Sequence, residues 1–185
     1  MKHLTLASGS PRRVNILSEW AAQHGWDITV SPTNADESVS AAWSAEQVAE
    51  ELAARKGREN TDKTVVVAAD TIVVREDETI LNKPVHGAEA RDMLLSLSMR
   101  THRVLTGIYL RYPDGREEIW HETAHVTFGD VAPYLNDYIS SGEPFDKAGG
   151  YGAQNIKWDV TIDGDPNCVI GLPMTKLAML LSEIV

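Results

Sequence analysis

The amino-acid sequence predicts an α/β protein in which helices pack on a mixed β-sheet. Strand-like and helix-like segments alternate through the first half of the chain, from residue 3 to residue 97. A long hairpin then occupies the middle of the chain, around the turn sequence Pro113-Asp114-Gly115. Because a hairpin pairs its two strands antiparallel, the predicted sheet is mixed rather than wholly parallel.

A short strand at residues 3–7 is predicted to lead into a helix that ends at Gly25. Ser10 is a favourable N-cap for this helix, and Pro11 is a favourable first helical residue. Apolar residues spaced three or four apart indicate its buried face: Val14, Leu17 and Ala21.

A second strand at residues 27–31 and a polar loop at residues 32–43 precede the next helix. Ser44 and Gln47 form a capping-box signature, which predicts a helix that reaches about Glu59.

The β-branched run at residues 64–69 is typical of a strand buried on both faces, with Asp70 and Thr71 expected at its end. The remaining elements are predicted as a short strand ending at residue 82, a helix at 87–97, hairpin strands at 103–112 and 117–128, a helix at 131–141, strands at 158–162 and 168–170, and a helix at 172–184. Because no internal repeat or low-complexity linker separates these elements, a single domain over residues 1–185 is expected.

The composition favours some classes of partner over others. The formal net charge is −10 and the pI is about 5.0, so the surface repels nucleic-acid backbones and anionic membranes. The most apolar stretch, residues 65–74, is interrupted by Asp70 and is too short to span a bilayer. With Cys168 as the only cysteine there is no disulfide framework, and the cytoplasm is the expected compartment.

The sequence Leu-Ala-Ser-Gly-Ser-Pro-Arg-Arg at residues 6–13 is the first candidate site. A helix N-terminus presents unpaired N–H groups, small residues allow a close approach, and Arg12 and Arg13 add charged donors, as a phosphate requires. A well-capped surface helix with two solvated arginines explains the same residues equally well.

Asp70 and Thr71 are the second candidate, because ligands of α/β proteins bind beyond the carboxyl ends of strands. A carboxylate there can bind Mg²⁺ or accept a proton from an attacking water. The alternative is an aspartate that only satisfies the chain where a strand ends. Asp36 and Glu37 offer two further carboxylates, which are expected in solvent unless another feature brings them to the site.

A glycine-rich segment at residues 141–154 is the third candidate, since four glycines and a proline specify unusual backbone geometry. Lys147 supplies charge, and the Gln154 amide can both donate and accept, as the recognition of a base edge requires. Lys83 precedes Pro84 on a rigid turn. Lys56 on the second predicted helix could face either solvent or the cleft, and periodicity alone favours solvent.

Taken together, these motifs resemble the Maf family, whose members were once described as septum-formation inhibitors and are understood as nucleoside triphosphate pyrophosphatases. The matching segments occur in the family's order: residues 6–13 (LASGSPRR), 69–73 (ADTIV), 83–84 (KP), 141–154 (SGEPFDKAGGYGAQ) and 167–173 (NCVIGLP).

The resemblance implies a Maf/ITPase-like fold with a strongly twisted central sheet, two lobes around a deep cleft, and a homodimer. It implies attack of water at the α-phosphorus of a nucleoside triphosphate, with Mg²⁺ or Mn²⁺ as cofactor. By position, Asp70 is the catalytic base or a metal-bound carboxylate, and Glu37 is a second metal ligand. The implied substrate-binding residues are Ser8, Arg12, Arg13, Lys56, Thr71, Lys83, Lys147 and Gln154.

Arg13, Thr71 and Gln154 match the positions that separate subgroups of the family, and their combination resembles the dTTP/UTP pyrophosphatases. The family pattern is broken at Asn82, Ala153 and Asn155, which touch the wall of the base pocket. Two alternatives are therefore kept. One is a pyrophosphatase for non-canonical purines or 7-methyl-GTP, and the other is a nucleotide-binding regulator of cell division.

Overall fold

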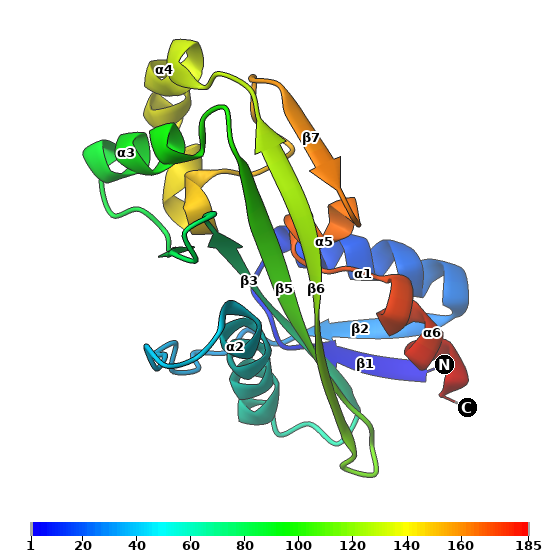
Figure 1. The fold of residues 1–185 in the computed structure, drawn as a ribbon. Coiled ribbons are helices and arrows are strands. Elements are labelled where there is room, and N and C mark those ends of the chain that lie inside the picture. The colour runs from blue at the N-terminus through cyan, green and yellow to red at the C-terminus, as the bar shows by residue number, and fades with distance from the viewer. Residues whose placement is uncertain (1, 185) are drawn as a thin grey trace. The chain divides into compact units, whose positions relative to one another are not determined.

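The computed structural model describes residues 2–184 (Figure 1). The strands are β1 (Lys2–Leu6), β2 (Trp26–Val30), β3 (Val65–Val74), β4 (Ile80–Leu81), β5 (Thr101–Arg111), β6 (Glu117–Phe128) and β7 (Val160–Asp163). The helices are α1 (Pro11–His24), α2 (Ala45–Glu59), α3 (Gly87–Leu97), α4 (Leu135–Ser140), α5 (Pro166–Ile170) and α6 (Thr175–Glu183). Short 3₁₀ turns are η1 (Ala132–Tyr134), η2 (Glu143–Asp146) and η3 (Ala148–Gly150).

The strands form one mixed sheet in the order β2-β1-β3-β5-β6-β7, and β4 pairs with β3 outside this path. β1 runs parallel to both β2 and β3, and Leu6 lies opposite Val30 and Val67 in the register. β4 and β7 run antiparallel to their neighbours β3 and β6. The sheet is twisted and flanked by helices, which confirms the predicted mixed α/β class.

The chain divides into two compact units that are each made of discontinuous segments. Unit 1 comprises the residues up to Asp70, then residues 106–122, and then the residues from Gly171 onward. Unit 2 comprises residues 71–105 and 123–170. β3, β5 and β6 contribute residues to both units, and each unit has a hydrophobic core of its own. The single domain and the two lobes around a cleft stay predictions.

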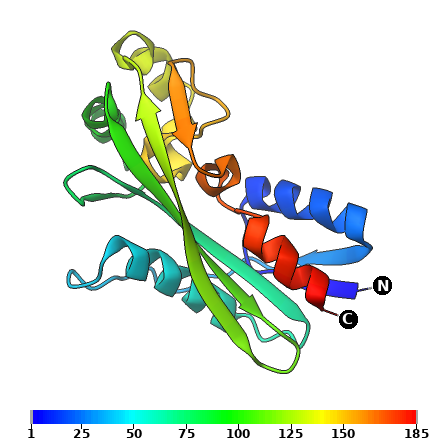
Figure 2. The same cartoon turned by 45° about the vertical axis from the view of Figure 1, so that its right-hand side comes forward.

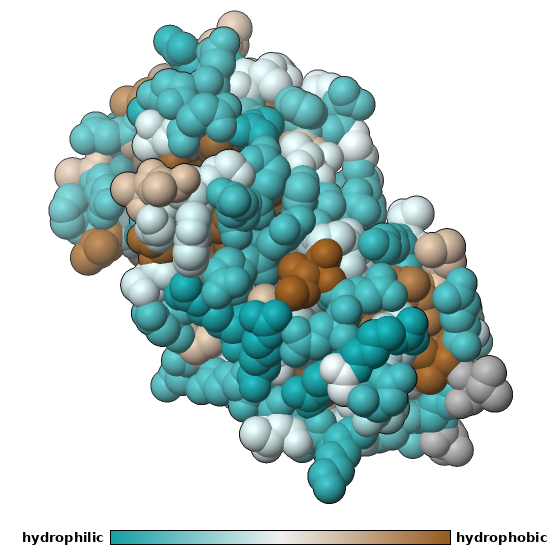
Figure 3. Space-filling view, turned by 60° about the horizontal axis from the view of Figure 1, so that its bottom comes forward, coloured by the Kyte–Doolittle hydropathy of each residue, from teal (hydrophilic) through white to brown (hydrophobic). Residues whose placement is uncertain are grey.

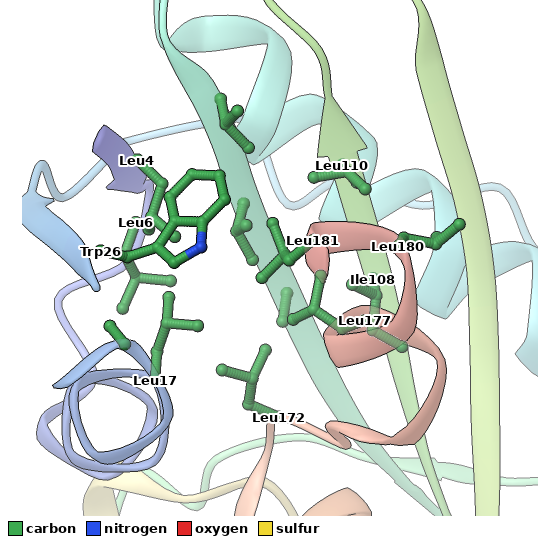
Figure 4. Packing of buried hydrophobic residues seen from close by; sticks show 14 of the residues in the cluster. Leu4, Leu6, Leu17, Trp26, Ile108, Leu110, Leu172, Leu177, Leu180 and Leu181 are labelled. Atoms are coloured by element: carbon green, nitrogen blue, oxygen red, sulfur yellow. The ribbon is translucent and has the colours of Figure 1, made fainter. Parts of the chain in front are cut away.

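In unit 1, helices cover both faces of β3. The odd-numbered residues from Val65 to Ala69 pack with α1 and α6, whereas Val66 and Ala68 pack with α2. In both ribbon views α1 and α6 lie on one side of β3 and α2 lies on the other (Figures 1 and 2). Figure 4 shows the first of these clusters, which includes Leu4, Leu6, Leu17, Trp26, Ile108, Leu172, Leu177 and Leu181.

Two glycines allow α2 to lie very close to β5. A Cβ atom built on Gly57 of α2 would lie 1.9 Å from Cδ1 of Tyr109. A Cβ atom built on Gly107 of β5 would lie 2.0 Å from the backbone oxygen of Ala49 in α2. Since both distances are far below van der Waals contact, this packing requires that both positions lack a side chain.

Unit 2 is built around aromatic side chains. Phe128 packs edge-on against Tyr151 and Trp158, with ring centroids 4.7 and 5.4 Å apart. His102 is buried among them, and its Nε2 lies 2.7 Å from the Tyr151 hydroxyl. Burial lowers the pKa of His102 to about 4, so this ring is neutral at physiological pH. Because Tyr151 belongs to the glycine-rich segment, the core of unit 2 anchors that segment.

Most predicted helix ends are confirmed. Pro11 is the first residue of α1, and Gly25 ends it in the left-handed region at φ 71°. Both reciprocal hydrogen bonds of the Ser44–Gln47 capping box are present in α2, at 2.9 and 3.3 Å. Ser10 occupies the N-cap position of α1 but makes no side-chain capping bond.

Two strand predictions are wrong. The segment predicted as a strand at residues 168–170 is the end of α5, because Asp165 accepts from the amides of Asn167 and Cys168 and starts a helical turn at Pro166. Short apolar runs of this kind do not separate strand from helix by periodicity. The strand before Asp70 does not end there either, because β4 pairs with residues 73–74 and keeps β3 extended.

The surface is largely polar. Hydrophilic residues predominate on the face shown in Figure 3, in agreement with the net charge of −10. In residues 2–184, each helix is too short or too polar to cross a membrane. Cys168 is fully buried in unit 2, and its thiol lies 3.5 Å from the backbone oxygen of Val104.

Gly107→Ala is expected to lower the free energy of unfolding by about 1–3 kcal/mol, because the added methyl group meets the α2 backbone. Urea unfolding measures this change. Gly9→Ala is the matched control, since its added Cβ would meet only Pro32 at 3.5 Å, an ordinary contact. Equal stability of Gly107→Ala and the wild-type protein would contradict the close approach of α2 and β5.

Candidate active site

Asp70 lies within β3, on the face that α2 covers. Side chains alternate along a strand, so Asp70 shares its face with Val66 and Ala68. The parallel pairing of β3 with β1 ends at Val67, so Asp70 follows the end of the parallel segment. It is 8% exposed. A carboxylate in such surroundings requires a charged or hydrogen-bonding partner.

That partner is Lys56 of α2, whose Nζ donates to Oδ1 of Asp70. Only 16% of the Lys56 side chain is exposed, so the prediction that it faces solvent is wrong. Lys56 follows Leu52 by four residues and Ala53 by three, and both are buried, which places it on the inward stripe of the helix. The stripe consists mostly of alanine and glycine, and a long side chain therefore fits beneath the helix.

Lys56 also pairs with Glu37, and its ammonium group thus joins two carboxylates; we call Glu37, Lys56 and Asp70 the carboxylate–lysine triad. Nζ of Lys56 lies 2.8 Å from Oε1 of Glu37. The Glu37 side chain is 60% exposed and the Asp70 side chain 12%, so the triad runs from solvent into the interior. Burial opposes the charge of Lys56, but the two carboxylates outweigh this effect and the pKa of Lys56 is raised.

The turn before α1 brings Ser8 and Arg13 together. The buried Ser8 hydroxyl accepts from Nη1 of Arg13 at 3.3 Å, and Nε of Arg13 donates to the backbone oxygen of Gly171 at 2.7 Å. Burial lowers the pKa of Arg13, the carboxylates of the triad oppose that effect, and Arg12 adds to it. Six predicted site residues thus lie in unit 1 and share one electrostatic environment: Ser8, Arg12, Arg13, Glu37, Lys56 and Asp70.

In unit 2, the side chain of Lys147 is folded into its own loop and is 9% exposed. Its ammonium group donates to the backbone oxygen of Glu143 at 2.8 Å and pairs with the carboxylates of Glu143 and Asp146 at 2.9 and 2.5 Å. Hydrogen bonds from Asn155 and Lys147 hold the pKa of Glu143 below its usual range. A Cβ on Gly152 would lie 2.7 Å from Cε of Lys147, so this glycine leaves room for the lysine.

The other three predicted substrate-binding residues also lie in unit 2. Thr71 follows the triad aspartate in β3, and strand alternation puts its side chain on the opposite face. Lys83 and Gln154 are exposed. The amide of Gly149 donates to the backbone oxygen of Asn82 at 3.2 Å, which ties the Lys83 turn to the glycine-rich segment.

Glu37 and Asp70 could bind a divalent cation such as Mg²⁺ or Mn²⁺, because such cations prefer carboxylate oxygens and the two carboxylates already lie around one positive group, the ammonium of Lys56. Within residues 2–184, no three His, Cys, Asp or Glu side chains are grouped as a ready-made metal site. A cation bound by Glu37 and Asp70 would therefore take its remaining ligands from water and phosphate oxygens, as Mg²⁺ usually does.

Two residues that shape these surroundings were not predicted. Gly152 gives Lys147 its space, but nothing in the sequence separates it from the other glycines of its loop. Arg55 donates to the backbone on either side of Glu37. Its partners lie 17 and 19 residues away in the sequence, so no local pattern indicates the contact.

Comparison with known proteins places the chain among close relatives. The family model described as "Maf-like protein" matches residues 3–184. A dTTP/UTP pyrophosphatase of Shouchella clausii is 38% identical over 189 residues, covering 99% of this chain and 96% of the relative. Proteins of the same name from Ruminiclostridium cellulolyticum and Symbiobacterium thermophilum are 36% and 39% identical and cover 100% and 99% of this chain and 97% and 94% of their own lengths.

Similar solved structures are more distant. A nucleoside-triphosphatase, also named dITP/XTP pyrophosphatase, from Mycobacterium abscessus aligns with a TM-score of 0.47 and 17% identity. The alignment covers 68% of this chain and 74% of that one. The Ham1 protein of Staphylococcus aureus aligns with a TM-score of 0.48 and 15% identity, over 69% and 72% of the two chains.

Lys56→Met is expected to lower the free energy of unfolding by about 3 kcal/mol, because it leaves the charge of Asp70 without its partner. Adding Asp70→Asn to this variant is expected to restore part of the loss. Urea unfolding at neutral pH measures both changes. The control is Lys63→Met, an exposed lysine expected to stay within about 0.5 kcal/mol of the wild-type value. A similar loss in both lysine variants would contradict the role of the triad.

Proposed function

This chain belongs to the Maf family, and from that premise we propose that it hydrolyses dTTP and UTP to the monophosphate and pyrophosphate. The observation that carries the proposal is the carboxylate–lysine triad, in which the carboxyl group of Asp70 lies against the largely buried ammonium group of Lys56. Relatives named dTTP/UTP pyrophosphatase, 36–40% identical over nearly the whole chain, support the choice of substrate.

The proposed reaction is attack of water on the α-phosphorus. The water oxygen forms a bond to that phosphorus, the bond to the oxygen bridging the α- and β-phosphates breaks, and pyrophosphate leaves. One water proton passes to the carboxylate of Asp70, the proposed general base. The hydrogen bond from Lys56 orients the carboxyl group of Asp70 before the substrate binds.

The negative charge of the triphosphate requires concentrated cationic groups. We propose that Ser8 and Arg12 bind the phosphates at the start of α1, where unpaired N–H groups favour anions. Lys56 of α2 is the third proposed phosphate ligand of unit 1. Lys83 and Lys147 are the proposed phosphate ligands of unit 2. Lys147 would then exchange its present carboxylate partners for phosphate oxygens.

Glu37 and Asp70 are the proposed ligands of the divalent cation, Mg²⁺ or Mn²⁺. When bound, such a cation would neutralise phosphate charge and polarise the oxygens at the reacting phosphorus.

Recognition of the pyrimidine base is assigned in this proposal to Arg13, Thr71 and Gln154. Arg13 is held by Ser8 and Gly171, so its guanidinium has a fixed orientation, as recognition by hydrogen bonds requires. Gln154 is exposed, and its amide can both donate to and accept from a base edge.

A cytoplasmic location and a homodimer belong to the same proposal. The single cysteine is buried, which suits a reducing compartment. The homodimer rests on the family resemblance alone.

We expect pyrophosphate release from dTTP and UTP in the presence of Mg²⁺ or Mn²⁺ and none in EDTA. The panel should include CTP, ITP and 7-methyl-GTP, with products separated by anion-exchange chromatography. Diphosphate and free phosphate as products would refute attack at the α-phosphorus. Turnover of purine nucleotides alone would discard the pyrimidine assignment, and tight binding without turnover would favour the regulatory alternative.

Asp70→Asn is expected to lower kcat by about 10²–10⁴ while leaving nucleotide affinity within a few-fold of the wild-type value. Single-turnover kinetics and equilibrium dialysis measure these two quantities separately. Asp92→Asn is the matched control, because it removes the same charge from an exposed position of α3 in unit 2. Full activity of Asp70→Asn would show that another group accepts the proton.

A further inference from the structure

Glu37 lies in a segment that has little structure of its own. Residues 31–44 contain no helix or strand, and most of them are exposed. Such a loop samples many conformations unless side chains from elsewhere restrain it, because each residue that is ordered loses conformational entropy. The ion pair with Lys56 alone restrains only the carboxylate of Glu37, at the end of a flexible side chain.

Arg55 restrains the backbone on both sides of Glu37. Its Nη1 donates to the backbone oxygen of Asp36 at 3.1 Å and to that of Ser38 at 2.6 Å. The two acceptors are the residues immediately before and after Glu37. The backbone on both sides of the Glu37 Cα atom is therefore held by one guanidinium group.

The guanidinium group of Arg55 is itself held in place. Its Nε donates to the carboxylate of Glu51, one turn earlier in α2, at 2.9 Å. Its Cζ lies 5.5 Å from the ring centroid of Trp43, at the far end of the loop. The Arg55 side chain is only 25% exposed. These contacts use the planar, forked set of donors that arginine has and lysine lacks.

The consecutive residues Arg55 and Lys56 together hold Glu37 in place. Arg55 holds the backbone around Glu37, and Lys56 holds its carboxylate. One turn later, Glu59 accepts from the amide of Asn34 at 2.9 Å and adds a second anchor to the same loop. The end of α2 thus determines where Glu37 lies relative to Asp70.

We propose that Arg55 is a positioning residue that fixes the Glu37 loop and thereby gives Glu37 and Asp70 their arrangement for a divalent cation. The proposal rests on the metal role in the proposed function. A looser loop would present Glu37 correctly only part of the time, and apparent affinity falls with that fraction. The loss is therefore expected in the affinity for the cation, and kcat at saturating cation and nucleotide is expected to change less than twofold.

The first test measures the loop without any metal or substrate. Hydrogen–deuterium exchange followed by mass spectrometry is expected to show faster exchange in residues 33–43 for Arg55→Lys and Arg55→Met. Arg58→Met is the matched control, because Arg58 lies on the same helix but pairs with Glu117 at 2.8 Å. Unchanged exchange in Arg55→Met would overturn the proposal, whatever the reaction of the protein.

The second test measures Mn²⁺ binding to the folded protein by electron paramagnetic resonance. Arg55→Met is expected to weaken Mn²⁺ binding by about tenfold to a hundredfold, as loss of a group that orients a ligand typically does. In a Glu37→Gln background the same substitution is expected to change the affinity less than about twofold, because its effect passes through Glu37. An equal effect in both backgrounds would overturn the proposal.

Two further results separate this proposal from the proposed function. If Arg55→Met unfolds the protein, Arg55→Lys and Glu51→Gln give milder perturbations of the same restraint. Each should speed exchange in the loop, and unchanged exchange in both would overturn the proposal. If exchange is faster but Mn²⁺ affinity is unchanged in both Arg55→Met and Glu37→Gln, the restraint is supported and the metal role of Glu37 is refuted.

Discussion

The close approach of α2 to β5 is the constraint on which the candidate site depends. Gly57 and Gly107 lack the side chains that would separate the two elements, and α2 therefore packs at a short distance from the sheet. At that distance Lys56 reaches Asp70 on β3, the strand next to β5, while Arg55 reaches the loop that contains Glu37. The close packing of α2 on β5 thus helps to determine the distances among the charged groups.

A partly buried ion pair such as that of the triad contributes little to the net stability of a fold. Removing a lysine and an aspartate from water costs several kcal/mol per ion, and their attraction only partly offsets that cost unless further bonds are made. Here the third member, Glu37, is mostly exposed and adds a bond to Lys56 at the solvent side. An arrangement that is costly to fold and open to solvent at one end is what a charged ligand needs, since little must reorganise when it binds.

Much of the fold follows from local signals in the sequence, whereas the site depends on contacts between distant residues. The capping box of α2, the end of α1 at Gly25 and the hairpin were predictable because each is determined by a few adjacent residues. The continuation of β3 through Asp70 was not, because pairing with β4 decides it. The inward position of Lys56 was predicted wrongly from periodicity, because the carboxylates that hold it, Glu37 and Asp70, are distant in the sequence. The hydrogen bonds from Arg55 to the backbone of residues 36 and 38 could not be predicted from any local sequence pattern.

The discontinuous construction of unit 1 has a consequence for its synthesis. The core around Leu4 and Leu6 includes Leu177 and Leu181 of α6, which are translated 173 residues after Leu4 (177 − 4) and 175 residues after Leu6 (181 − 6). Until then the apolar stripes of β1 and α1 lack part of their cover, in a state prone to association with other chains. A nascent chain of this protein therefore depends on α6 to complete the cover of this core.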